Sequence, residues 1–68
     1  MSFEELKQFI IKNLKIHKTV PMCWLYMFAE LNNVDVNTIE DVLTELKRDG
    51  LVKLDVFDVY WLGGGAES

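Results

Sequence analysis

The side chains that could perform acid–base, nucleophilic or metal chemistry are few and scattered along the chain. One cysteine, Cys23, and one histidine, His17, do not complete the ligand set of a structural zinc ion. The adjacent carboxylates Glu40 and Asp41 fall on an expected exposed helix, with no apolar pocket to separate their pKa values for catalysis. The sequence also lacks a glycine-rich phosphate loop between a strand and a helix, and a serine with a neighbouring base. We therefore expect no enzymatic activity, no metal and no cofactor.

Cys23 is the single cysteine, so it cannot form a disulfide within the chain. No run of cations surrounds it to activate its thiol, and we expect a small buried hydrophobic residue there. An unpaired cysteine is compatible with a reducing compartment. The longest uncharged run, residues 19–29, is far shorter than the roughly 20 apolar residues of a spanning helix, and residues 1–5 lack a basic, apolar leader. We expect a cytoplasmic protein with no membrane contact.

Length and composition limit the class of protein. The chain has 68 residues, 50% of them hydrophobic, with seven basic and eleven acidic side chains. This composition is too apolar and too weakly charged for intrinsic disorder, and the length leaves room for one domain. We predict a single domain over residues 1–62 and a flexible glycine-rich tail over residues 63–68.

Two amphipathic helices follow from the spacing of apolar residues. The first is expected over residues 2–16, with Ser2 as its N-cap and Glu5 as the capping-box partner. The second of these covers residues 37–48 and has Asp35 or Asn37 as a cap. Gly50 is expected to adopt the left-handed conformation that stops the helix after Arg48. Their apolar stripes are formed by Phe3, Leu6, Phe9, Ile10 and Leu14, and by Ile39, Val42, Leu43 and Leu46.

Between them, residues 20–31 predict a helix that is apolar nearly all round, with Pro21 in its first turn and Glu30 as its one charge. Helical spacing groups one set of residues, expected to face the core: Val20, Trp24, Met27, Phe28 and Leu31. The opposite side is formed by Met22, Leu25, Tyr26 and Ala29. Either the core wraps around this helix or the second face binds another chain. The small domain favours a partner interface, most simply with a second copy.

After Gly50 the pattern changes to β-branched and aromatic residues. We predict two short strands, 51–55 and 59–62, joined by a turn at 56–58 that leaves Phe57 exposed at its tip. The expected fold is therefore α+β and mostly α, with three helices followed by a two-stranded β-hairpin.

This order, together with the run Leu43, Leu46, Gly50, Leu51 and Val52, resembles the winged helix-turn-helix family of small archaeal and bacterial regulators. The resemblance covers about residues 3–62 and implies a recognition helix at 37–48 and a wing at 52–62. It implies a DNA-binding transcriptional regulator, expected to be dimeric. The residues that it places against DNA are Asn37, Thr38, Thr44, Arg48 and Lys53.

The charge distribution indicates an alternative function. Residues 1–18 carry four lysines against two glutamates, a net charge of +2, whereas residues 30–58 carry eight acids against three bases, a net charge of −5. The expected DNA-reading surface is thus the acidic part of the chain, and DNA binding depends on cations that neutralise phosphates. The alternative is a winged-helix protein-interaction module that does not bind DNA through its acidic third helix.

Overall fold

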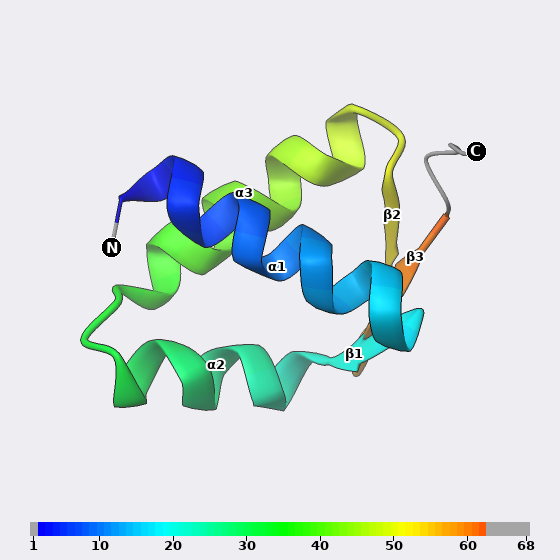
Figure 1. The fold of residues 1–68 in the computed structure, drawn as a ribbon. Coiled ribbons are helices and arrows are strands. Elements are labelled where there is room, and N and C mark those ends of the chain that lie inside the picture. The colour runs from blue at the N-terminus through cyan, green and yellow to red at the C-terminus, as the bar shows by residue number, and fades with distance from the viewer. Residues whose placement is uncertain (1, 63–68) are drawn as a thin grey trace.

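The computed structural model describes residues 2–62 and is an α+β, mostly helical fold of three helices and three short strands (Figure 1). The predicted tail, residues 63–68, lies outside the described residues. In chain order the elements are α1 (Phe3–His17), β1 (Thr19–Pro21), α2 (Met22–Leu31), α3 (Val36–Arg48), β2 (Val52–Leu54) and β3 (Asp58–Trp61).

The start of α1 is held by the predicted capping box. The hydroxyl of Ser2 accepts a hydrogen bond from the Glu5 N–H at 3.2 Å, and the Glu5 carboxylate accepts one from the Ser2 N–H at 2.9 Å. Hydrogen bonding to the Ser2 backbone and hydroxyl lowers the pKa of Glu5. The helix ends one residue beyond the predicted boundary, at His17.

The sheet has three strands rather than the two that were predicted, because β1 precedes α2. The strand order is β1-β3-β2 and both pairs are antiparallel, so β3 lies in the centre. In the register, Val20 of β1 lies opposite Val59 of β3. A three-residue strand ending in proline has no room for an apolar–polar alternation, which is why the pattern did not indicate it.

The prediction of which face of α2 is buried was wrong. Leu25 is 1% exposed and Ala29 is fully buried, whereas Met27 is 59% and Leu31 80% exposed. Val20 belongs to β1, so it does not indicate which face of α2 is buried. Because α2 is apolar on both sides, the spacing of its apolar residues cannot distinguish the buried face from the exposed one.

The third helix and the wing follow the prediction more closely. Asp35 is the N-cap of α3, and its carboxylate accepts a hydrogen bond from the Asn37 N–H at 2.8 Å. After the helix, Gly50 adopts a φ of 76°, the left-handed conformation expected there. Strand β2 is two residues shorter than predicted, whereas β3 has the predicted length of four residues but begins one residue earlier. Phe57, in the turn between them, is 76% exposed.

One apolar core lies between the three helices and one face of the sheet. Each strand contributes a buried valine, namely Val20, Val52 and Val59, and the helices supply the rest. The buried helical residues are Leu6, Ile10, Leu14, Leu25, Ala29, Ile39, Val42, Leu43 and Leu46. Within the described part of the chain, no polar or charged side chain is buried, and no helix is long and apolar enough to cross a membrane.

Candidate interaction surfaces

The outward side of α3 forms a ridge that contains three of the five residues predicted to contact DNA. Asn37, Asp41, Thr44 and Arg48 are exposed at four-, three- and four-residue spacings, opposite the stripe of α3 that enters the core. The side chain of Arg48 is 71% exposed, and its Nη2 lies 3.9 Å from Glu45 Oε2. The ridge therefore combines two polar side chains and one cation with the carboxylate of Asp41 at its centre.

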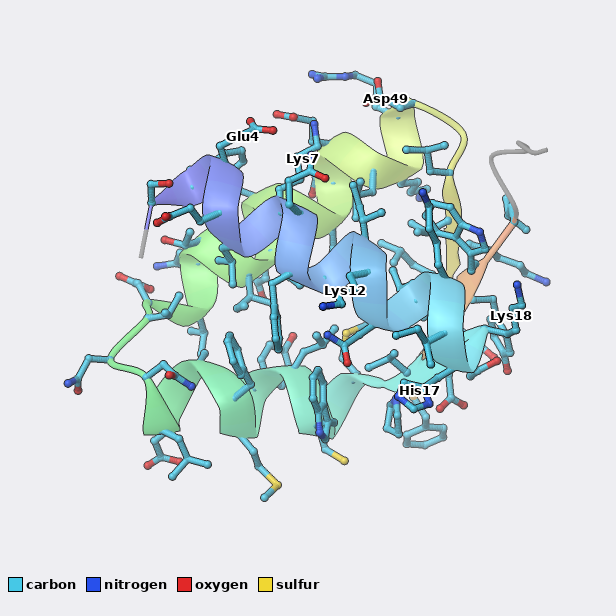
Figure 2. The ribbon with its side chains drawn as sticks, in the orientation of Figure 1. Glu4, Lys7, Lys12, His17, Lys18 and Asp49 are labelled. Carbon is cyan, nitrogen blue, oxygen red and sulfur yellow. The ribbon has the colours of Figure 1, made fainter. Side chains whose placement is uncertain are left out.

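Thr38 does not belong to this ridge. It is half-buried and lies seven residues, or two helical turns, before Glu45, on the flank of α3 that packs toward α1. Glu45 accepts a hydrogen bond from the ammonium group of Lys7, which lies on the side of α1 toward α3 (Figure 2). This ion pair joins α1 and α3 on the flank beside the ridge.

The ion pair shifts the pKa values of both groups. The hydrogen bond from Lys7 lowers the pKa of Glu45 below its ordinary value of 4.5, and the same bond raises the pKa of Lys7 above 10.5. The pair therefore stabilises the fold between these values. Its contribution is lost as the pH falls below 4.5 through the folded-state pKa of Glu45, and as the pH rises above 10.5 through that of Lys7.

We expect Lys7→Met to return the pKa of Glu45 toward 4.5, because the group that stabilises the charged carboxylate is removed. An NMR titration that follows the Glu45 side-chain carboxyl carbon measures this change. Lys12→Met is the matched control, since it removes an exposed lysine from the same helix. An unchanged Glu45 pKa in Lys7→Met would contradict the role of the ion pair.

The first half of α3 has an acidic surface. Asp35 caps the helix, and Glu40 and Asp41 are exposed in its second turn, whereas residues 35–42 contain no lysine or arginine. Glu40 also lies on the flank toward α2, where its Oε2 is 3.5 Å from the hydroxyl of Tyr26. In a recognition helix this half meets the bases and the nearest phosphates.

The wing presents one cation and an apolar tip. Lys53 is exposed on β2, opposite Tyr60 of β3. At the tip, Val56 is 78% exposed beside the similarly exposed Phe57. The carbonyl of Phe57 accepts a hydrogen bond from the Met22 N–H at 2.7 Å, so the tip adjoins the first residue of α2.

The exposed side of α2 is an apolar stripe formed by Cys23, Trp24, Met27 and Leu31, which we call the outer stripe. Cys23 is exposed, so the prediction of a buried cysteine was wrong, because a lack of neighbouring cations in the sequence does not determine burial. Of the predicted partner interface, Leu25 and Ala29 lie in the core, Met22 is half-buried, and Tyr26 is 37% exposed toward α3. Three residues of the outer stripe, Trp24, Met27 and Leu31, were grouped on one face from the sequence, but that face was assigned to the core.

Trp24 of the outer stripe packs against two further aromatic rings. Phe9 of α1 stacks on Phe28 of α2 with a centroid separation of 4.6 Å, and Trp24 stacks on Phe28 at 5.9 Å. The third pair, Phe9 and Trp24, is separated by 6.2 Å, and all three pairs of rings are nearly parallel. Aromatic pairs of this kind add to the packing of Trp24 against the domain.

Comparison of the chain with protein-family models, with curated proteins and with solved structures found no significant match. Among residues 2–62, no three histidine, cysteine or acidic side chains come together in a way that could hold a metal ion.

Proposed function

We propose that this chain is a non-enzymatic protein-interaction domain with a winged-helix arrangement, and that α3 does not read DNA. The observation that carries the proposal is the acidic first half of α3, where Asp35, Glu40 and Asp41 face solvent without a lysine or arginine among residues 35–42. Duplex DNA carries one negative charge per about 1.7 Å of its axis, so this surface repels the ligand that the fold resemblance implies.

Two cations of α1 and α3 already lie next to a carboxylate of α3. Lys7 is engaged with Glu45, and the guanidinium of Arg48 lies near the same carboxylate. A carboxylate can accept a hydrogen bond from cytosine, but base contacts require phosphate contacts to hold the register. The charge pattern therefore favours a partner other than nucleic acid.

The outer stripe of α2 supports a protein partner. Met27 and Leu31 are large apolar side chains with more than half of their surface exposed, and they adjoin Trp24 on one side of a helix. Methionine and aromatic residues are enriched in protein interfaces, and contiguous exposed apolar surface marks interaction sites. We propose a cytoplasmic location, because a reducing compartment would keep the exposed thiol of Cys23 from oxidation.

A DNA-binding transcriptional regulator is the second candidate function. The ridge of α3 supports it, because Asn37, Thr44 and Arg48 are exposed in line along the helix, and Lys53 is exposed on the wing. These side-chain types are those that contact bases and phosphates.

A titration of labelled duplex DNA at about 50 mM and about 200 mM salt tests the two functions. We expect no binding at either salt concentration, with a basic winged-helix protein of known affinity as the positive control. Binding that weakens steeply with salt and is reduced in Arg48→Ala, but not in the control Lys12→Ala, would overturn the interaction-domain proposal in favour of the regulator.

A further inference from the structure

We propose that the partner of the outer stripe is a second copy of this chain, with the two α2 helices packed antiparallel about a twofold axis at Met27. The inference rests on the proposed function and names the partner of that surface. It is carried by the spacing of the stripe, by the charge at the two ends of α2 and by the length of the helix.

The spacing of the stripe is that of a helix–helix seam. Trp24, Met27 and Leu31 recur at three- and four-residue intervals, the pattern with which one helix packs along another. The same helix already buries Leu25 and Ala29 on its other side. Thus α2 has two apolar faces, of which the core covers one.

The charges of α2 favour an antiparallel copy of itself. Glu30 is its one charged residue and lies in the last turn, whereas the first turn has no acidic residue and the N-cap, Pro21, makes no side-chain hydrogen bond to it. When Met27 lies opposite Met27 in an antiparallel pair, Glu30 lies opposite Trp24 of the second copy. Each carboxylate then lies near the positive end of the other helix, where an anion is stabilising.

The same register matches the apolar side chains. Leu31, which is 80% exposed, lies opposite the small Cys23 of the second copy, and the two Met27 side chains meet at the axis. A ten-residue helix is about 15 Å long, so the interface is at the small end of specific interfaces. We expect weak, reversible association, with a dissociation constant on the order of 10–100 µM.

Sedimentation equilibrium over about a hundredfold range of protein concentration tests the dimer. The wild type is expected to shift from 7.9 kDa toward twice that mass, and Met27→Glu is expected to remain monomeric because two carboxylates would meet at the axis. Val56→Glu adds the same charge at an exposed apolar position of the wing and is expected to dimerise normally. A monomeric wild type up to about 1 mM, or a Met27→Glu variant that dimerises like the wild type, overturns the proposal.

Glu30→Lys tests the charge argument. Both symmetric sites change from a favourable to an unfavourable interaction with a helix N-terminus, and we expect the dimer to weaken about tenfold. Glu4→Lys makes the same change of charge on α1 and is expected to leave the dissociation constant unaltered. Equal effects of the two substitutions would contradict the antiparallel arrangement.

The register is tested by disulfide formation in Leu31→Cys. Within one chain, positions 23 and 31 are two helical turns apart, about 12 Å, too far for a disulfide, whereas the antiparallel pair brings Cys23 of one copy to position 31 of the other. Mild oxidation is expected to give a covalent dimer linked between positions 23 and 31, as identified by peptide mapping. Cross-links between two Cys23 residues, or no covalent dimer, would overturn the register.

These results are separable from the test with DNA. A monomeric wild type that does not bind DNA overturns the second copy as partner and leaves the interaction domain standing. Salt-sensitive DNA binding that is reduced in Arg48→Ala but not in Lys12→Ala overturns the interaction-domain proposal whatever mass is measured.

Discussion

Leu25→Ala is expected to lower the free energy of unfolding by about 2–5 kcal/mol, the range for removing a buried leucine side chain. Leu25 is 1% exposed and belongs to the core cluster, so truncation leaves a cavity among packed neighbours. Met27→Ala on the same helix is expected to cost less than about 1 kcal/mol, since Met27 is 59% exposed. The two variants thus report which face of α2 the core covers.

Urea denaturation followed by circular dichroism measures both effects. The protein concentration should be kept low, so that self-association does not contribute to the midpoint. Because a small domain has a small total stability, Leu25→Ala could be unfolded in water, and Leu25→Met, a nearly volume-conserving change, provides a folded comparison with a loss below about 1.5 kcal/mol. A larger loss of stability in Met27→Ala than in Leu25→Ala would contradict the assignment of the faces.

The second large effect concerns the acidic half of α3. The double substitution Glu40→Lys and Asp41→Lys is expected to create DNA binding, whereas we expect none for the wild type. The net charge changes from −4 to 0, because each replacement adds two charges, and the added cations lie where a recognition helix meets phosphates. We expect a dissociation constant of about 1–100 µM, the range of non-specific binding.

Fluorescence anisotropy with labelled duplex DNA at two salt concentrations measures this gain. Glu4→Lys combined with Asp49→Lys has the same net charge but places the lysines outside the first half of α3, and it is expected to bind at least about tenfold more weakly. Equal binding by the two double variants would indicate a response to net charge alone. Absence of binding by Glu40→Lys with Asp41→Lys would show that α3 does not present its outward ridge to a duplex.

The elements that the sequence predicted best are the two helices whose boundaries are marked by capping residues or by a glycine. The capping box at Ser2 begins α1 as predicted, and Asp35 and Gly50 flank α3. Each observed boundary of these two helices therefore lies within one residue of its predicted position. The segment around Pro21 was harder, because proline at a helix start also suits the end of a short strand. Its burial depends on pairing with β3, almost forty residues away in the chain.

The candidate surfaces were predictable to different degrees. The periodicity of α3 was sufficient to place Asn37, Thr44 and Arg48 on its exposed side, since its apolar stripe is narrow. No local pattern indicated that Lys7 would engage Glu45, because the two residues are 38 positions apart. For α2, the composition correctly indicated two apolar faces, but the choice between them depended on contacts with the other helices.

The strand order β1-β3-β2 has a consequence for aggregation. It leaves β1 and β2 as the two edges of the sheet, where unpaired backbone groups can recruit a strand from another molecule. Pro21 removes an N–H group at the end of one edge, and Lys53 places a charge in the middle of the other. Both edges are short and protected against strand addition, so the sheet cannot readily grow into a fibril.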